Sequence, residues 1–357
     1  MEYGTIVMDK PGIQEIFSKF SGCPAISVKP VNQGLINATF LVTDQDNKQF
    51  ILQQVNREVF PEPLQLMQNI ARTLPLLSDP DYHALKLYRT LGDELLYQDR
   101  HKNYWRLFSY VPGSEAYDLP PELKVAEKAG WLVGKFHCLL QHADPSQYHV
   151  VIPDFHSLQH RYRQFEEALL QGKEERLSKV KPLLGFITHT AAILQEYMSD
   201  ELPVRLCHND TKLNNMLFSS DDKKPLCLID LDTLMPGFLR YDLGDALRTV
   251  VNTAAEDEQA LENISFSKEH FTAFIEGLGQ HPVFMTEEEK KEIANSVAYM
   301  PFLHGLRALT DYLMGDVYYK VKSPEQNLDR SLSLFRFAEL ALAERLFMQG
   351  VVQRILR

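Results

Sequence analysis

The sequence lacks a long apolar stretch, a closely spaced cysteine pair and the features of a secretion signal. No apolar run reaches membrane-spanning length, and residues 1–10 do not combine a basic start with an apolar core. The four cysteines, Cys23, Cys138, Cys207 and Cys227, form no Cys-x-x-Cys pair. We therefore expect buried free thiols in a reducing compartment, and a cytoplasmic protein.

Dense basic segments are also missing. The chain carries 37 Lys and Arg against 48 Asp and Glu, a net charge of -11, and its longest basic clusters are Lys223-Lys224 and Lys290-Lys291. This balance argues against nucleic acid or a membrane surface as the main partner, but it leaves room for a local nucleotide pocket. With 45% hydrophobic and 24% charged residues, 357 residues suffice for a globular protein of two lobes.

The chain is organised as a β-rich part followed by a helical part. Val111-Pro112-Gly113 interrupts the pattern, so we predict an α+β fold with a β-rich N-terminal lobe, residues 1–110, and a mainly helical C-terminal lobe, residues 111–357. In the first lobe, strands are expected at 25–30, 38–43, 49–55, 95–99 and 103–110, with a helix at 60–77. In the second, helices are expected at 122–141, 158–171, 177–198 and from 238 onwards, and short strands at 204–207, 216–218 and 226–229.

A polar segment between two of these short strands carries the chemistry. It runs His208-Asn209-Asp210-Thr211-Lys212-Leu213-Asn214-Asn215, and a later apolar strand ends in Asp230. Asp210 can orient an attacking hydroxyl and accept its proton, while Asn215 and Asp230 can hold Mg²⁺ against phosphates. Lys212 can offset the charge of a transferring phosphoryl group, and we expect His208 to brace the loop.

The pattern His-x-Asp-x-Lys-x-x-Asn, followed by a strand that ends in Asp, resembles the catalytic loop and metal-binding aspartate of the protein-kinase-like fold. The Val-Pro-Gly break, residues 132–137 (Leu-Val-Gly-Lys-Phe-His) and residues 241–245 (Tyr-Asp-Leu-Gly-Asp) resemble the aminoglycoside phosphotransferase and choline kinase family. Within it, residues 32–37, 50–56, 208–215, 229–237 and 305–316 resemble the N-acetylhexosamine 1-kinases. The resemblance implies a two-lobed kinase fold that uses ATP and Mg²⁺. In that fold, residues 1–110 would be the nucleotide-binding lobe and residues 111–357 the catalytic and substrate lobe.

The expected nucleotide site departs from the wider kinase pattern. Kinases of this fold usually place a Lys or Arg on the third strand, where this sequence has only Gln53 and Gln54. Strand alternation lets only one of the two face the nucleotide; Gln53 is a candidate, and the sequence alone does not decide between it and Gln54. Gly34 and Asn37 are the candidates of a sparse glycine-rich loop. Just before the Val-Pro-Gly break between the two lobes, in the hinge segment, Phe108 and Tyr110 are the candidates for contact with adenine.

The acceptor site is expected in the helical lobe. Arg307 and Tyr318 belong to a polar and aromatic run there, and Asp232 and Thr233 follow the metal strand. Arg307 and Asp311 are four residues apart, so an intrahelical salt bridge is the alternative to a sugar-binding cluster. Asp242 and Asp245 are expected to cap the following helix or brace the catalytic loop.

The resemblance implies an enzyme that transfers the γ-phosphate of ATP to the anomeric hydroxyl of an N-acetylhexosamine. Alternatives within the family are an amino-alcohol kinase, which would need an aromatic cage for its cation, and an aminoglycoside kinase, which would need an acidic site. A nucleotide-binding pseudokinase that acts as an interaction module is the alternative from another class, favoured by the missing strand lysine. We expect a monomer whose partners are a sugar and ATP.

Overall fold

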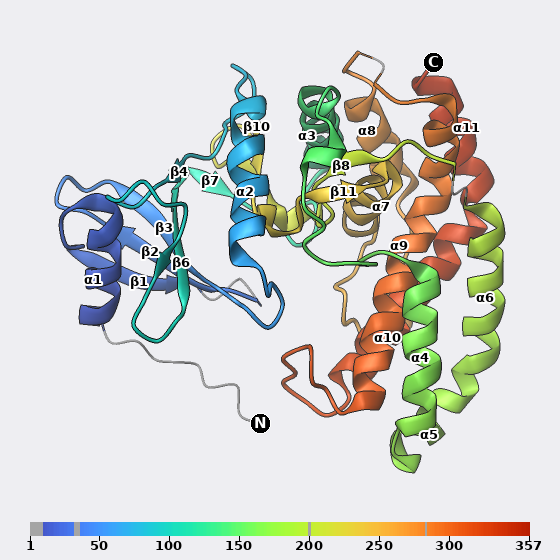
Figure 1. The fold of residues 1–357 in the computed structure, drawn as a ribbon. Coiled ribbons are helices and arrows are strands. Elements are labelled where there is room, and N and C mark those ends of the chain that lie inside the picture. Colours follow the sequence, from blue (N-terminus) through green and yellow to red (C-terminus); the bar gives the residue numbers. More distant parts are fainter. Residues whose placement is uncertain (1–9, 32–35, 199–200, 283) are drawn as a thin grey trace. The chain divides into compact units, whose positions relative to one another are not determined.

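The computed structural model describes residues 10–31, 36–198, 201–282 and 284–357 (Figure 1). The chain divides into two compact units. The N-terminal unit comprises residues 1–113 with 148–152, and the C-terminal unit comprises 114–147 with 153–357. No described helix is both long and apolar enough to cross a membrane.

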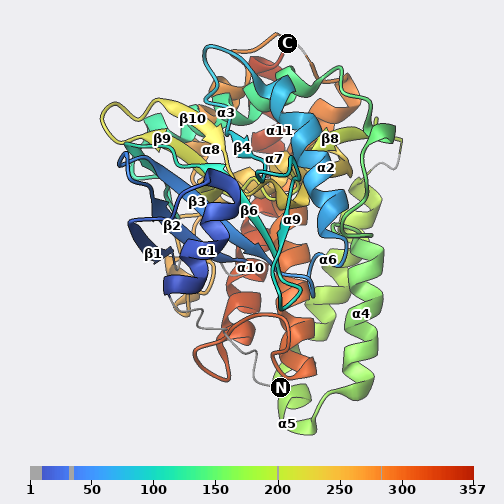
Figure 2. The same ribbon diagram turned by 60° about the vertical axis from the view of Figure 1, so that its left-hand side comes forward.

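The N-terminal unit is built on an antiparallel sheet. Its strand order is β1 (Ser27–Val31), β2 (Ala38–Thr43), β3 (Gln49–Val55), β6 (Tyr104–Ser109) and β4 (Leu87–Tyr88), and β5 (Tyr97–Gln98) also pairs with β6. The predicted bounds of β2 and β3 are confirmed, because alternating β-branched and aromatic residues there flank a turn of Asp and Asn. The sheet and its helices are also seen in Figure 2.

Two helices cover opposite faces of this sheet. On one face, α1 (Lys10–Ser21) buries Ile13 and Phe17 against a core that includes Trp105. On the other face lies α2 (Pro63–Thr73), whose Met67 contacts the Arg106 side chain. Figure 1 shows the sheet between the two helices. Alternation along β3 therefore assigns Gln53, which meets Arg106, to the α2 face.

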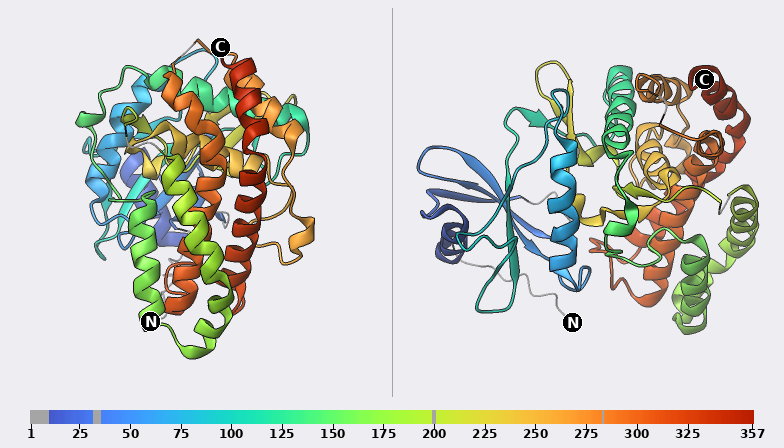
Figure 3. Two further views of the ribbon diagram at one scale, coloured as in Figure 1. Left: turned by 90° about the vertical axis from the view of Figure 1, so that its right-hand side faces the viewer. Right: turned by 45° about the horizontal axis from the view of Figure 1, so that its top comes forward.

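The C-terminal unit is helical around one long buried helix. Its helices are α3 (Leu123–Leu140), α4 (Leu158–Gln171), α5 (Glu174–Val180), α6 (Leu184–Tyr197), α7 (Leu239–Val250), α8 (Lys268–Leu278), α9 (Glu287–Met314), α10 (Gln326–Ala343) and α11 (Arg345–Ile355). Thr286 and Glu289 form a capping box that fixes the start of α9. Helix α9 then packs against α4, α7, α10 and α11 (Figure 3).

Two small sheets in the C-terminal unit frame the polar segment found in the sequence. One has the order β7 (Ser114–Glu115), β9 (Met216–Ser219) and β10 (Pro225–Leu228), and the other pairs β8 (Arg205–Cys207) with β11 (Met235–Gly237). All of these pairs are antiparallel, and the strands predicted at 216–218 and 226–229 are confirmed as β9 and β10, which pair with each other. Residues 208–215 therefore start at the end of β8 and lead into β9.

The predicted fold class is confirmed, but several elements differ from the prediction. The helix predicted at 177–198 is divided between α5 and α6, and residues 315–325, predicted to be helical, are irregular. The helix α1 was not predicted, although Ile13, Ile16, Phe17 and Phe20 have helical spacing, because Pro11 and Gly12 interrupt the pattern at its start. Residues 251–267 were predicted to be helical, but they form an irregular segment with one short 3₁₀ turn, Leu261–Asn263. The segment is held by a bridge between Asn252 and Phe266.

Candidate active site

The buried carboxylate of Asp242 on α7 holds the start of the expected catalytic loop, residues 208–215. Asp242 Oδ2 accepts the backbone N–H of His208 at 2.8 Å, and Oδ1 accepts that of Asn209 at 2.6 Å. The Thr211 hydroxyl donates to the Asp242 carbonyl oxygen. His137 Nε2 lies 3.0 Å from Oδ2. Of the two roles expected for Asp242, the structure shows the bracing of the loop.

Asn209 ties the loop to β11. Its backbone is left-handed, with φ of 62°, a conformation that Asn tolerates better than most residues. Its Nδ2 donates to the carbonyl oxygens of Cys207, Thr233 and Met235. A Cβ at Gly237 would lie 2.8 Å from Asn209 Oδ1, so the close approach of the two segments needs glycine at this position.

His208 braces the loop from inside, as expected from the sequence. Its Nε2 lies 2.9 Å from the carbonyl oxygen of Ile229, and its Nδ1 accepts the backbone N–H of Asp210 at 3.3 Å. Because one ring nitrogen accepts and the other faces a carbonyl, the hydrogen bonds assign the neutral tautomer with the proton on Nε2. The ring therefore links the catalytic loop to the residue before Asp230.

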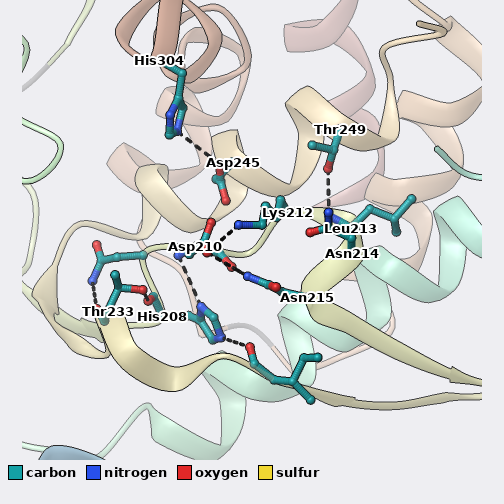
Figure 4. Close-up of polar contacts among 12 residues, drawn as sticks. His208, Asp210, Lys212, Leu213, Asn214, Asn215, Thr233, Asp245, Thr249 and His304 are labelled. Carbon is teal, nitrogen blue, oxygen red and sulfur yellow. Dashed lines mark hydrogen bonds and ion pairs between the residues drawn. The ribbon is translucent and has the colours of Figure 1, made fainter. Parts of the chain in front are cut away.

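Asp210, Lys212 and Asn215 converge on one another (Figure 4). Asp210 Oδ2 accepts hydrogen bonds from Lys212 Nζ and from Asn215 Nδ2, both at 2.8 Å. Asn215 Nδ2 also donates to the Asp210 carbonyl oxygen at 2.8 Å. Both side-chain hydrogen bonds use Oδ2, so Oδ1 is the oxygen that this arrangement leaves to face a substrate hydroxyl.

Asn215 and Asp230 supply the oxygen ligands that a hard cation would need. Asn215 uses its Nδ2 as a donor, so its Oδ1 is left as an acceptor. Within the described part of the chain, Oδ1 takes part in no hydrogen bond. Asp230 follows β10 in a left-handed conformation, φ 60°, ψ 59°. The described residues contain no cluster of three His, Cys, Asp or Glu that could hold a metal alone. This sparse set suits Mg²⁺, which usually takes one or two carboxylates together with substrate phosphates.

Lys212 is surrounded by negative charge. Burial opposes its charged form, but the carboxylates of Asp210, Asp230 and Asp245 outweigh burial and raise the pKa of Lys212 above its usual value. In Figure 4 the carboxylate of Asp245 points toward Lys212. Lys212 is therefore charged throughout the physiological pH range and can face a phosphoryl group without a proton transfer of its own.

Asp245 itself belongs to a buried ion-pair network. Arg248 Nε lies 2.7 Å from its Oδ1, and His304 Nε2 lies 3.4 Å from the same oxygen. Arg248 also pairs with Glu256. Burial raises the pKa of Asp245, but Arg248 and His304 overcome this and hold it well below its usual range. Glu256 lies in the irregular segment 251–267.

In the N-terminal unit, the structure adds a cation to the expected nucleotide-binding residues. Gln53 Oε1 accepts a hydrogen bond from Arg106 Nε at 3.0 Å, and Gln53 Nε2 donates to Thr39 Oγ1 at 3.1 Å. The guanidinium of Arg106, on the neighbouring strand β6, therefore lies beside Gln53 on β3, the strand on which kinases of this fold usually carry a lysine or arginine. Sequence analysis missed it because the pairing of β3 with β6 joins residues 53 positions apart.

The other nucleotide candidates lie in different parts of this unit. Asn37 Oδ1 accepts the backbone N–H of Asn56 at 3.0 Å and so holds the ends of β2 and β3 together. Phe108 is buried in β6 opposite Ile51, and Tyr110 is half-buried just after the strand. Gly34 lies outside the described residues.

Tyr318, another of the acceptor candidates, lies beside Arg307 on α9. Its guanidinium lies over the rings of Phe155 and Tyr318, 4.9 and 5.7 Å from their centroids, and its Nη2 is 3.5 Å from the Tyr318 hydroxyl. A second arginine, Arg161 on α4, donates from Nε and Nη2 to the carbonyl oxygen of Phe155, at 3.2 and 2.9 Å. Burial and the neighbouring charge of Arg307 lower the pKa of Arg161 to about 10, so both groups are cations at neutral pH.

Asp311 does not form the intrahelical salt bridge that was the alternative interpretation of its spacing from Arg307. No ion pair between Arg307 and Asp311 is present among the described residues. The Asp311 carboxylate accepts the backbone N–H groups of Val317 at 2.9 Å, Tyr318 at 2.7 Å and Tyr319 at 2.9 Å, and Asn327 Nδ2 at 2.9 Å. Gly315, with φ of 97°, reverses the chain at the end of α9. Asp311 thus anchors the turn that presents Tyr318 to Arg307.

Asp232 and Thr233 are both buried in the short 3₁₀ turn Leu231–Thr233 after Asp230. The Thr233 hydroxyl donates to the His208 carbonyl oxygen at 2.7 Å, so this side chain connects the metal strand to the catalytic loop. Sequence reasoning did not single out Phe155, His156 or His304, which join the same region from distant parts of the chain. Isolated aromatic residues and histidines carry no local signal of such a role.

A carboxylate in contact with a lysine and an asparagine, on a loop between two short strands and braced by a buried aspartate, is an arrangement that a phosphotransferase catalytic loop would need. The chain belongs to the phosphotransferase enzyme family, whose model matches residues 27–272.

Solved structures with a similar fold include three small-molecule kinases. A microcompartment-associated aminopropanol kinase is 18% identical, with a TM-score of 0.66, over 96% of this chain and 99% of that one. A spectinomycin phosphotransferase in complex with ADP and spectinomycin is 14% identical, with a TM-score of 0.58, over 94% and 98%. An ethanolamine kinase from Plasmodium vivax is 13% identical, with a TM-score of 0.56, over 90% and 82%. At these identities the likeness shows the fold.

Proposed function

We propose that the protein is an ATP- and Mg²⁺-dependent kinase that phosphorylates the anomeric hydroxyl of an N-acetylhexosamine. The observation that carries the proposal is a cluster of two arginines and two aromatic rings in the same unit as Asp210. Its members are Arg161, Arg307, Phe155 and Tyr318. The resemblance of residues 229–237 and 305–316 to the N-acetylhexosamine 1-kinases supports the choice of sugar.

In the proposed reaction, the acceptor oxygen attacks the γ-phosphorus of ATP, a new P–O bond forms, and the bond to ADP breaks. Asp210 accepts the hydroxyl proton through Oδ1, while Lys212 and Asn215 hold Oδ2 in place. Lys212 also offsets negative charge on the transferring group. Asn215 Oδ1 and Asp230 would hold the Mg²⁺ ion, which neutralises phosphate charge when bound.

The charges around the acceptor candidates favour a neutral substrate. An amino alcohol or an aminoglycoside carries at least one positive charge at neutral pH and would have to bind beside Arg161 and Arg307. Like charges so close together raise the free energy of binding. A neutral sugar instead accepts hydrogen bonds from a guanidinium and from the half-exposed Tyr318 hydroxyl, and packs its ring on aromatic faces.

Two rivals remain distinct from this proposal. An amino-alcohol kinase is the second candidate, because an aminopropanol kinase and an ethanolamine kinase share the fold. A pseudokinase is disfavoured by the assembled contacts of Asp210, Lys212 and Asn215, and by the Arg106 guanidinium beside Gln53, which places a cation near the strand where the lysine is missing.

A substrate panel separates these possibilities. Release of ADP is measured with ATP, Mg²⁺ and, in turn, N-acetylglucosamine, N-acetylgalactosamine, choline, ethanolamine, aminopropanol and an aminoglycoside. We expect turnover with an N-acetylhexosamine and none with the cationic acceptors. Turnover of a cationic acceptor alone would assign the rival kinase, and no turnover with any acceptor, despite ATP binding, would favour the pseudokinase.

A variant of Asp210 makes the panel specific to this site. Asp210→Asn should lose about 10²–10⁴-fold in kcat while it still binds ATP, since removal of a general base commonly costs this much. Asp222→Asn, an exposed aspartate in the turn between β9 and β10, is the matched control and should keep wild-type turnover.

A further inference from the structure

We infer that His156 is a positioning residue, which holds the catalytic loop in register with the turn that carries Phe155. The inference rests on the proposed function in one respect, the placement of the acceptor beside Phe155 and Arg307. His156 belongs to no motif of the sequence and lies more than 50 residues before Asp210. It nevertheless contacts Asn209, the residue directly before Asp210.

The first half of the link is a hydrogen bond to the loop. His156 Nε2 lies 2.9 Å from the carbonyl oxygen of Asn209, and the residue is 3% exposed. Only an N–H can satisfy a carbonyl, so Nε2 carries the proton. Burial, and after it the charge of nearby His304, lower the pKa of His156 to about 3. The ring is therefore neutral at working pH and serves as a fixed donor.

The second half of the link is the backbone around His156. The preceding residue, Phe155, has its carbonyl oxygen clamped by Arg161 and its ring under Arg307. The His156 carbonyl oxygen accepts the Tyr299 hydroxyl at 2.7 Å, and that same oxygen of Tyr299 accepts the Leu158 backbone N–H at 3.1 Å. Helices α4 and α9 thus fix His156 from both sides of the chain.

These contacts make one connected path from the acceptor candidates to the base. A group that binds against Phe155 and Arg307 is held by the same short segment that holds Asn209, and Asn209 immediately precedes Asp210. Since an error of about 1 Å in the reacting distance can cost about 100-fold in rate, this path would set the distance between Asp210 and the acceptor hydroxyl. His156 would contribute by position alone, because its donor is already used by Asn209.

The test compares variants that keep or remove the donor. His156→Gln retains an N–H near the place of Nε2, whereas His156→Leu removes it and His156→Asn shortens the side chain so that its donor falls short. We expect kcat, with whichever acceptor the panel identifies, to fall about 10–100-fold in His156→Leu and His156→Asn. His156→Gln should recover to within about threefold of wild type, and Kd for ATP should be unchanged in all three.

His281 provides a matched control for loss of stability. It is a half-buried histidine of the same unit, and its Nε2 makes the same kind of bond, 2.7 Å from the carbonyl oxygen of Trp131. His281→Leu should destabilise the protein without lowering kcat. If His281→Leu lowers kcat as much as His156→Leu, or if His156→Gln is no better than His156→Asn, the positioning role is wrong.

A second readout does not depend on the identity of the acceptor. Amide hydrogen exchange in the peptide that covers residues 206–214 should speed up at least tenfold in His156→Leu and stay at the wild-type rate in His281→Leu. Unchanged exchange in His156→Leu would overturn the inference even if the sugar kinase assignment holds. Faster exchange in the absence of any turnover would support the inference while the proposed function fails.

Discussion

Asp242→Asn should weaken the fold and the activity together, because one side chain holds two backbone groups of the catalytic loop. The carboxylate accepts the N–H groups of His208 and Asn209 and is fully buried. An amide of the same shape can keep one of these hydrogen bonds, but its NH₂ group faces the other N–H.

The magnitude follows from these two contacts. Losing a charge-assisted hydrogen bond to a buried donor costs about 1.5–3 kcal/mol, and the remaining bond weakens when the charge is removed. Together they lower the free energy of unfolding by about 2–4 kcal/mol, which corresponds to a fall in Tm of about 5–15 °C for a unit of this size. A loop displaced by about 1 Å would also lower kcat about 100-fold.

The assay is thermal unfolding followed by circular dichroism, with ADP release measured well below the lower Tm. Asp222→Asn, whose carboxylate accepts the exposed backbone N–H of Lys224 at 3.0 Å, is the control and should change Tm by no more than about 1 °C. If Asp242→Asn melts within about 2 °C of the wild type and retains its turnover, the bracing of the loop by this carboxylate is refuted.

Four further predictions concern the acceptor, the metal and the pH dependence. Arg307→Met should raise KM for the sugar about 10–100-fold with Kd for ATP unchanged, because it keeps packing on Phe155 but loses the donors; an equal loss of ATP affinity would contradict this placement. Asp311→Asn should raise KM for the sugar more than it lowers kcat, since it loosens the turn of Tyr318; steady-state kinetics with an unchanged KM would remove Asp311 from acceptor binding. Asp230→Asn should raise the Mg²⁺ concentration needed for half-maximal rate, and more than Asn215→Ala does, because Asp230 carries the charge; identical Mg²⁺ titrations in wild type and Asp230→Asn would exclude it as a ligand. Burial lowers the pKa of His156 to about 3 in the folded protein, against its ordinary 6.5, so between these pH values the unfolded chain binds a proton that the folded protein does not. The free energy of unfolding should therefore fall as the pH drops from 6.5 toward 3, by up to about 1.4 kcal/mol per pH unit. Free energies of unfolding from denaturant titrations should depend less steeply on pH in His156→Gln than in the wild type, and an equal pH dependence would contradict burial of the neutral ring.

The catalytic loop could be predicted because its information is local. Asp210, Lys212 and Asn215 lie within six consecutive residues between two short strands, and the structure brings these three side chains into mutual contact. The hairpin of β2 and β3 was predictable for the same reason, since its alternation and its turn are adjacent in the chain.

The support of the site could not be predicted, because it depends on contacts between distant segments. His156 meets Asn209, and Arg106 meets Gln53, only after helices and strands have packed. Asp311 illustrates the converse case. Its spacing from Arg307 is compatible with a local ion pair, but in the structure its carboxylate instead accepts hydrogen bonds from three backbone N–H groups and from Asn327. Local spacing predicts which groups can meet, whereas tertiary structure decides which do.

The central claim is tested most directly by the phosphorus NMR spectrum of the product formed from ATP, Mg²⁺ and an N-acetylhexosamine, with Asp210→Asn in parallel. We predict a sugar phosphate whose phosphorus couples to the anomeric proton, formed at least 100-fold more slowly by the variant. A product phosphorylated at the 6-hydroxyl, or no sugar phosphate while a cationic acceptor is phosphorylated, would contradict the proposed function.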